Sequence, residues 1–213
     1  MNQKFELTED VMVFNGKRLR RVRALRDFGF VKKGEVGGWV EKEENLSDKG
    51  WAWIDDDAMV TGNARVQDDA KVFGCAMING NAIIQGNAYV ADYARVNDNA
   101  VVTDNAYIRD HAIVSGNARI AGRVELTGET KVVGDALIRE KEDLLVISIL
   151  GSRLDTITFY RDISGRIFVK CGCYVGDIDK FTREVKKTHR RNKFAKEYAL
   201  AAKLAKVHMR GQK

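Results

Sequence analysis

A six-residue repeat occupies the middle of this chain and leaves few folds open to it. Alanine recurs at every sixth position from Ala52 to Ala118, and the same spacing continues, with Val and Thr at two positions, to Ala136. Two positions after each of these residues stands an aliphatic side chain, from Ile54 to Ile138. Fifteen such hexads follow one another without an insertion. A fixed period of this kind is the signature of a repeat architecture, so it constrains the fold before any single element is considered.

The chemistry of one hexad predicts a short strand followed by a corner. Successive side chains of a strand point to opposite faces, so the alanine and the aliphatic residue point to the same side. Glycine or aspartate follows two positions later, commonly with Asn or Asp behind it, as in Gly62-Asn63 and Asp98-Asn99. These residue types tolerate the positive φ angles of tight turns. We therefore expect stacked coils with flat faces and an apolar interior.

The motif Val-x-Gly-Asn-Ala-x resembles the hexapeptide repeat of left-handed parallel β-helices, in which three hexads make one triangular coil. The resemblance covers residues 52–140 and implies a mainly β fold, a left-handed parallel β-helix of about five coils. With neighbouring coils spaced like neighbouring strands, such a prism is roughly 24 Å tall. The left-handedness comes from the resemblance, because the period alone does not fix it.

The segments on either side of the repeat resemble proteins of phages and prophages. Arg20–Arg26, Gly37–Val40 and Glu43–Ser47 look like the opening of phage β-helix proteins usually described as hexapeptide-repeat or polymer-forming proteins. Phe159-Tyr160 and Val169–Cys173 belong to a tail that is similar to a module found in phage proteins. The resemblance implies a phage or prophage origin.

Residues 1–51 predict an N-terminal β-hairpin cap. A stack of β coils exposes unpaired backbone at both ends, which invites polymerisation unless each end is covered. Asn15-Gly16, between an apolar run and a basic run, is typical of a tight hairpin turn. We expect Trp39, Trp51 and Trp53 to lie in the core where the cap meets the first coil.

Residues 141–213 predict a small α+β module ending in two helices. Leu144–Leu150, Thr156–Arg161 and Arg166–Cys173 are rich in β-formers. Asp177 or Asp179 is placed to cap a helix that carries Phe181 and Val185 on one side. A second helix from about Asn192 to His208 aligns four side chains for packing on the sheet, namely Phe194, Tyr198, Ala201 and Ala205.

Composition excludes several classes of protein. The longest apolar run, Leu144–Leu150, has seven residues, far below the ~18 of a membrane span. The N-terminus lacks the apolar stretch of a signal peptide, so we expect a cytoplasmic protein, in the infected bacterial host cell if the phage resemblance holds. Three cysteines, Cys75, Cys171 and Cys173, make an odd count and argue against a disulfide framework.

Charge is distributed unevenly along the chain. Residues 1–33 carry a net +5, residues 179–213 carry +9, and the 145 residues between them carry −8. Any anion site is therefore expected at the ends, in two dense basic clusters. The first, the arginine arm, is Arg18, Arg20, Arg21 and Arg23; the second, the helix junction, is Lys187, His189, Arg190, Arg191 and Lys193. Guanidinium groups beside a helix start are suited to phosphate, although a solvated basic face is an equal alternative.

The sequence disfavours an enzyme. The hexapeptide proteins known best are acyltransferases, which generally use a histidine base, often with an inserted loop; here only His111, His189 and His208 exist and no hexad is interrupted. The three histidine ligands of a zinc carbonic anhydrase are missing. Cys171-Gly172-Cys173 lacks two further zinc ligands, so we expect packing there and predict no catalytic residue, metal or cofactor.

Stacking of residues eighteen apart predicts how the molecule associates. Ile83 and Val101 fall on one outward face in adjacent coils, an apolar stripe that a monomer should not expose. β-helices of this type commonly pack three prisms side by side, so we expect a homotrimer with this contact.

These observations favour a non-enzymatic, phage-encoded binding protein. Its basic pockets would take a host protein or a phosphate-bearing small ligand, for example by blocking a defence protein or sequestering a nucleotide signal. Nucleic acid is possible but not favoured, because few aromatics interleave with the arginines, and no membrane partner is expected. The alternatives are a hexapeptide-type acyltransferase and a structural component of phage assembly.

Overall fold

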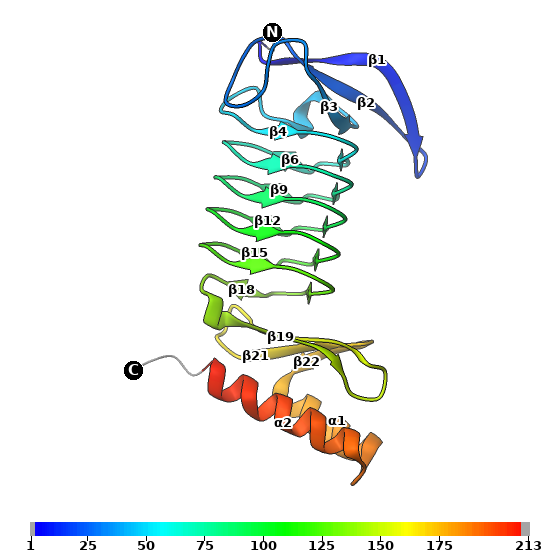
Figure 1. Cartoon of the computed structure of the whole chain (residues 1–213), viewed down its shortest axis with the longest axis vertical. Coiled ribbons are helices and arrows are strands. Elements are labelled where there is room, and N and C mark those ends of the chain that lie inside the picture. Colours follow the sequence, from blue (N-terminus) through cyan, green and yellow to red (C-terminus); the bar gives the residue numbers. More distant parts are fainter. Residues whose placement is uncertain (1–2, 210–213) are drawn as a thin grey trace.

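Two-residue strands stack into a β-solenoid through the middle of the computed structural model, which describes residues 3–209 (Figure 1). The strands come at the hexad spacing, each ending on the aliphatic residue of its hexad. They are β4 (Trp53–Ile54), β5 (Met59–Val60), β6 (Arg65–Val66), β7 (Lys71–Val72), β8 (Met77–Ile78), β9 (Ile83–Ile84), β10 (Tyr89–Val90), β11 (Arg95–Val96), β12 (Val101–Val102), β13 (Tyr107–Ile108), β14 (Ile113–Val114), β15 (Arg119–Ile120), β16 (Glu125–Leu126), β17 (Lys131–Val132) and β18 (Leu137–Ile138).

Parallel pairing between strands eighteen residues apart produces three sheets, one for each face of the solenoid. Val101, for example, pairs with Ile83 on one side and Arg119 on the other. The alanines from Ala52 to Ala118 are buried, as are the aliphatic residues two positions later. The predicted architecture, a mainly β solenoid with an apolar interior and a small C-terminal α+β part, is confirmed.

Aspartates hold the corners of the solenoid. Asp98 adopts a φ of 61°, in the left-handed region that Asp tolerates better than most residues. Its carboxylate accepts a hydrogen bond from the backbone N–H of Gly116 in the next turn, at 2.9 Å. Asp68 and Asp104 make the same bond to Gly86 and Gly122. Each of these Asp corners therefore satisfies a backbone donor of the turn that follows.

The solenoid has about six turns rather than five, because residues before the repeat build most of an extra one. β3 (Val36–Val40) pairs in parallel with β5, and Leu46 bridges Val66. A 3₁₀ turn, η1 (Glu43–Asn45), lies between them. The Asn45 amide donates to the carbonyls of Gly62 and Ala64, at 3.1 and 2.8 Å, and so fastens this irregular turn to the regular ladder.

A hairpin lies at the N-terminal end of the solenoid. β1 (Phe5–Phe14) and β2 (Lys17–Ala24) pair around a turn in which Asn15 and Gly16 both have positive φ, and β2 continues onto β3. Trp53 is fully buried against the edge of Phe28, with 5.5 Å between ring centroids. The expectation for Trp51 is wrong: its side chain is 57% exposed, because it lies over the outer surface of Gly29 instead of under the cap.

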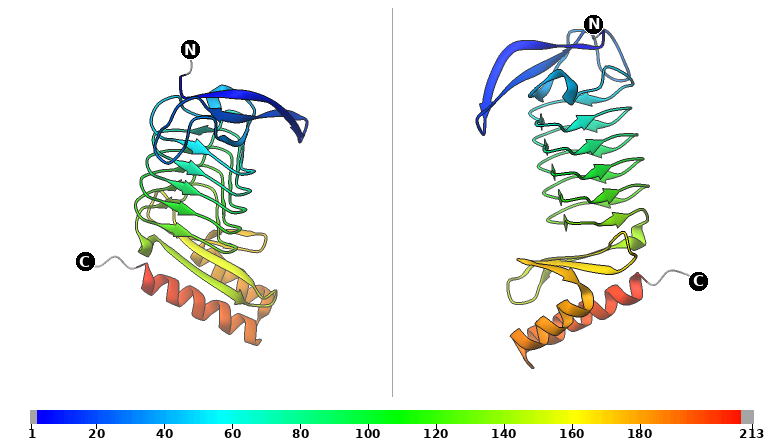
Figure 2. Two further views of the ribbon diagram at one scale, coloured as in Figure 1. Left: turned by 45° about the horizontal axis from the view of Figure 1, so that its top comes forward. Right: turned by 180° about the vertical axis from the view of Figure 1, so that it is seen from behind.

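A four-stranded antiparallel sheet closes the C-terminal end. It consists of β19 (Leu144–Leu150), β20 (Asp155–Arg161), β21 (Ile167–Cys171) and β22 (Tyr174–Asp177), and follows the 3₁₀ turn η2 (Lys141–Asp143). Tyr160 and Leu144 pack on the solenoid core, whereas Ile157, Phe159 and Val169 face the helices. The sheet is thus a middle layer between the solenoid and the helices, as Figures 1 and 2 show.

The two helices begin where the sequence predicts. α1 (Ile178–His189) is capped by the Asp177 side chain, which accepts from the N–H groups of Asp179 and Lys180. α2 (Lys193–His208) is capped by Asn192. Phe181 and Val185 of α1 and Tyr198, Ala201 and Ala205 of α2 are buried against the sheet. No helix within residues 3–209 is long and apolar enough to cross a membrane.

Candidate functional site

Part of the arginine arm is engaged in contacts within the protein. Arg21 donates to the carbonyls of Gly37 and Asp56, at 3.0 and 2.8 Å, and to the Asp57 carboxylate at 2.8 Å. Its guanidinium also lies 4.5 Å above the Trp39 ring. Arg21 therefore clamps the cap to the first turns.

Fewer cations of the arm remain available than the sequence suggests. Arg23 pairs with Glu6 at 3.4 Å, a contact between half-exposed groups. Arg18 is exposed and Arg20 is half-buried, and neither forms an ion pair within residues 3–209. Arg21 and Arg23 are thus already engaged, and only two of the four predicted arginines are left for an anion, which weakens the arm as an anion site.

The cations of the helix junction are exposed and, within residues 3–209, unpaired. Lys187, Arg190, Arg191 and Lys193 are all exposed, and none of them takes part in an ion pair in the described part of the chain. Cations at the end of α1 suit the helix dipole, but Lys193 is the first residue of α2, where a cation is unfavourable. The first turn of α2 also contains no acidic side chain. An anion bound beside Lys193 would neutralise this cation and would also supply the negative charge that the first turn of α2 lacks.

A pocket of about 270 Å³ opens next to this junction, and no pattern in the sequence predicted it. His189 is the one predicted site residue that lines it, and its ring packs 5.4 Å from Tyr198. The other lining residues come from the β19–β20 loop, the β21–β22 turn and the two helices: Ser152, Arg153, Asp155, Cys171, Gly172, Cys173, Tyr174, Phe181, Glu184, Val185, Thr188 and Tyr198.

The walls of the C-terminal pocket are held in place by side chains of α2. The Tyr198 hydroxyl accepts from the N–H of Ser152 at 3.2 Å, and Glu197 accepts from the N–H of Gly151 at 3.1 Å. Burial, followed by the nearby Asp155 charge, raises the pKa of the Cys171 thiol and keeps it protonated. No group of three His, Cys, Asp or Glu side chains within residues 3–209 is arranged to hold a metal.

The two basic clusters lie at opposite ends of the molecule. The arginine arm belongs to the N-terminal cap and the helix junction to the C-terminal module, with the whole solenoid between them (Figures 1 and 2). Within one chain they cannot share a small ligand, so each must be judged by its own surroundings.

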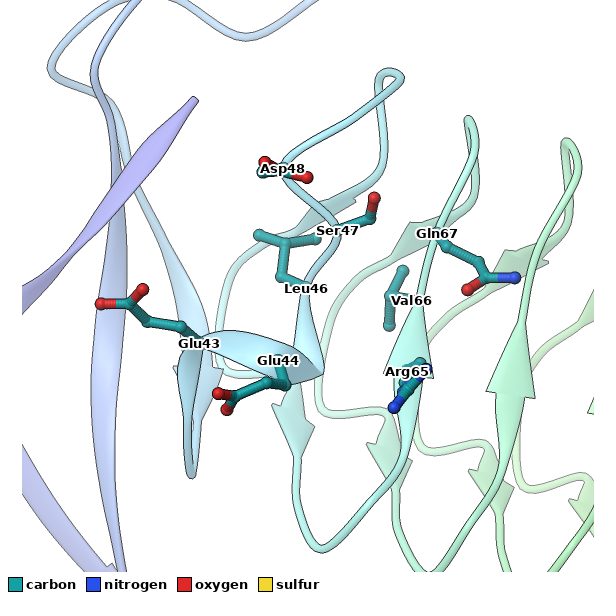
Figure 3. A pocket seen from close by; sticks show the side chains of 8 residues that line it. All are labelled: Glu43, Glu44, Leu46, Ser47, Asp48, Arg65, Val66 and Gln67. Atoms are coloured by element: carbon teal, nitrogen blue, oxygen red, sulfur yellow. The ribbon is translucent and has the colours of Figure 1, made fainter. Parts of the chain in front are cut away.

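A second hollow, of about 470 Å³, lies on the solenoid near η1 (Figure 3). It is acidic: Glu43, Glu44 and Asp48 line it against a single cation, Arg65. Three carboxylates repel an anion, so this hollow is a poor phosphate site although it lies at the same end as the arginine arm.

The remaining predicted residues lie apart from these pockets. His111 is exposed at a corner and stacks on Tyr93, with 5.1 Å between ring centroids, while His208 contacts the carbonyl of Leu144 at 3.1 Å. Ile83 and Val101 are adjacent on one solenoid face, as expected, but both are half-buried in the single chain.

Comparison with known proteins gives one distant relationship. The chain is 29% identical over 87 residues to an uncharacterized acetyltransferase, YdcK, of Escherichia coli strain K12. The match covers 34% of this chain and 27% of that protein, so the chain spans about a quarter of the length of the curated relative it matches. No family model matches the sequence.

Proposed function

We propose that this chain is a non-enzymatic binding protein whose C-terminal pocket captures a small ligand bearing a ring and a phosphate. The observation that carries the proposal is the position of His189, which lines the pocket and belongs to the unpaired basic junction. One ligand can therefore contact an apolar cavity and a cluster of cations at the same time.

The interior of the pocket suits a ring. Tyr174, Phe181 and Tyr198 contribute aromatic surface, and the volume of about 270 Å³ is close to the lower end of ligand pockets, ~300 Å³. Small-molecule sites are mostly apolar with a few polar groups that fix orientation. Ser152, Asp155 and Thr188 would supply such groups here.

The surroundings of the pocket suit an anion. Arg153 and His189 line it together with the carboxylates of Asp155 and Glu184, and the cations that outnumber these carboxylates lie at the adjoining helix junction, without ion-pair partners in residues 3–209: Arg190, Arg191 and Lys193. Hydrogen bonds between guanidinium and phosphate are roughly twice as strong as neutral ones. The N-terminus of α2, where Asn192 accepts from the Ala195 N–H, adds the positive end of a helix dipole to the same region.

A ligand of this chemistry is a nucleotide or a nucleotide-like signal. In a phage-encoded protein, its capture would counteract a host defence that depends on such a signal, which is the setting we propose for this chain. Alternatively, the same basic surface would bind a host defence protein and block it.

The test is a binding screen with AMP, cyclic AMP, NAD⁺, coenzyme A and inorganic phosphate, by thermal shift and then calorimetry. We expect a nucleotide to bind and Arg190→Glu/Arg191→Glu to weaken it at least tenfold, more so at low salt. Thr188→Trp should block the pocket. Arg95→Glu/Arg119→Glu, on the solenoid, is the matched control and should bind normally. Failure of every probe at millimolar concentration would refute the proposal.

Acetyl transfer is the second candidate, favoured by the match to an uncharacterized acetyltransferase. It predicts binding of acetyl-coenzyme A and loss of transfer on substitution of a histidine, with exposed His111 the first to test. Binding of coenzyme A without turnover, undiminished in His111→Ala, would support a binding protein instead. A structural component of phage assembly would copurify with virions and ignore all of these probes.

A further inference from the structure

A column of aromatic rings runs down one face of the solenoid, far from the C-terminal pocket. Phe30 from the cap lies 5.9 Å from Phe73, Phe73 lies 5.1 Å from Tyr89, and Tyr89 lies 4.4 Å from Tyr107. The last two pairs are stacked, with interplanar angles of 22° and 11°. The rings of successive turns therefore cover one another's faces and present their edges and hydroxyls outward.

A groove of about 660 Å³ lies along this column. Its lining combines cap and solenoid: Gly29, Phe30, Trp51, Asp69, Lys71, Asn87, Tyr89 and Tyr107. Trp51 is 57% exposed and packs one side of its ring near Gly29, so an open aromatic surface remains at the cap end of the groove. Phe30 and Tyr107 are each 42% exposed.

Polar groups line the groove beside this aromatic surface. Five of its eight lining residues carry a polar head: Asp69, Lys71, Asn87, Tyr89 and Tyr107. Asp69 accepts from the N–H of Trp51 at 2.9 Å, and the Lys71 ammonium lies 4.1 Å above the Phe30 ring. The side chain of Asn87 and the hydroxyls of Tyr89 and Tyr107 make no hydrogen bond to any other part of residues 3–209.

Charge selects the kind of ligand. Asp69 offsets the charge of Lys71, so the eight lining residues carry no net charge and give a phosphate or a nucleic acid no excess of cations to bind. A purely apolar partner would leave the Asn87 amide and two hydroxyls without hydrogen bonds, which is costly on burial. A neutral ring with apolar faces and hydroxyl edges satisfies both conditions.

We infer that this groove binds a neutral saccharide. One sugar ring stacks on the open face of Trp51, and its hydroxyls bond to Asn87 and to the tyrosine hydroxyls. The lining spans three successive turns of one face, at Lys71, Tyr89 and Tyr107, about 10 Å at the spacing of strands, so the site takes more than one sugar unit.

The experiment titrates the full-length protein with three neutral trisaccharides, cellotriose, maltotriose and triacetylchitotriose. Binding is followed by calorimetry and by tryptophan fluorescence; of the three tryptophans Trp51 is the exposed one, whereas Trp39 is half-buried and Trp53 is buried, so a signal that Trp51→Ala abolishes comes from the groove. We expect one trisaccharide to bind, Trp51→Ala to weaken it at least tenfold, and Asn87→Ala to weaken it severalfold. Both side chains are exposed, so the variants should fold.

The matched control is Tyr93→Ala, which removes an equally exposed aromatic that stacks on His111 outside the groove. It should bind as the unmodified protein does. Three results would overturn the inference: no trisaccharide binds at millimolar concentration, Trp51→Ala binds undiminished, or Trp51→Ala dissociates an oligomer that ignores sugars. The last result would identify the groove as a contact between copies of the chain.

Discussion

The hydroxyl of Tyr160 donates a hydrogen bond to the carbonyl of Val133, 3.0 Å away, and so joins the C-terminal sheet to the last turn of the solenoid. The Tyr160 ring is fully buried in the solenoid core. Burial raises the pKa of this hydroxyl to about 12, so it stays a donor at every physiological pH. The end cap is thus fastened by a protonated phenol as well as by apolar packing.

We expect Tyr160→Phe to lower the free energy of unfolding by about 1–3 kcal/mol, because the Val133 carbonyl loses its buried partner. Tyr160→Ala should cost about 3–5 kcal/mol, since it also opens a cavity. Urea denaturation followed by circular dichroism measures both. Tyr107→Phe, at a half-exposed ring, is the control and should be nearly neutral; an equal loss there would contradict the assignment.

Lys4 gives the protein a specific dependence on pH. Its side chain is buried and donates to the carbonyls of Ser47 and Lys49, at 2.8 and 3.4 Å. Burial, then repulsion from Arg26, lowers its pKa from 10.5 to about 8. Between these values the unfolded chain binds more protons than the native protein, so the contribution of Lys4 to stability rises with pH from about 8 to 10.5.

The check is the free energy of unfolding of the unmodified protein and of Lys4→Met at pH 7.5 and 9.5. The stability of the unmodified protein should rise relative to that of the variant between the two values. Parallel pH profiles would show that Lys4 titrates normally.

Substitution of two arginines of the arm should affect stability to different degrees. Arg21→Ala removes three hydrogen bonds and the contact with Trp39, and we expect a loss of about 1–3 kcal/mol. Arg18→Ala should stay within about 0.5 kcal/mol of the unmodified protein, as exposed substitutions usually do. Thermal denaturation distinguishes them, and a tolerated Arg21→Ala would mean that the clamp is dispensable.

Self-association through the Ile83 and Val101 face remains a prediction. If three copies pack through this face, Val101→Glu buries a charge at the contact and should yield monomers in light scattering. Glu125→Gln, on another face, should leave the assembly unchanged. A monomeric unmodified protein at micromolar concentration would refute the homotrimer.

The repeat made most of the fold predictable, because the residue types within each hexad indicate one short strand and one turn. The extra turn was missed because Trp39, Leu46 and Trp53 are spaced by seven residues, with η1 between the first two. The structure explains the glycine at position 37 of this turn: a Cβ there would lie 2.3 Å from the Ile54 carbonyl oxygen and 2.6 Å from the Trp53 ring.

The candidate sites were predictable only in part. The sequence indicated His189 and the junction, but the pocket also needs Arg153 of the β19–β20 loop and Cys171 of β21, which only the fold brings to the junction. Arg21 looked like surface charge because its backbone and carboxylate partners are fifteen or more residues away. The groove escaped notice because the exposure of Trp51 depends on the path of the loop at Gly29.

The corner bonds between successive turns also determine how the molecule can change in length. Each turn pairs with the next through residues eighteen apart, and the corners occupied by Asp, such as Asp98 and Asp104, repeat the same bond to the turn that follows. Removing or adding eighteen residues within the regular region would preserve every face and shift the two end modules relative to each other by about 4.8 Å along the axis. The distance between the cap and the C-terminal pocket can therefore change only in steps of one turn. A variant one turn shorter should fold with both ends intact.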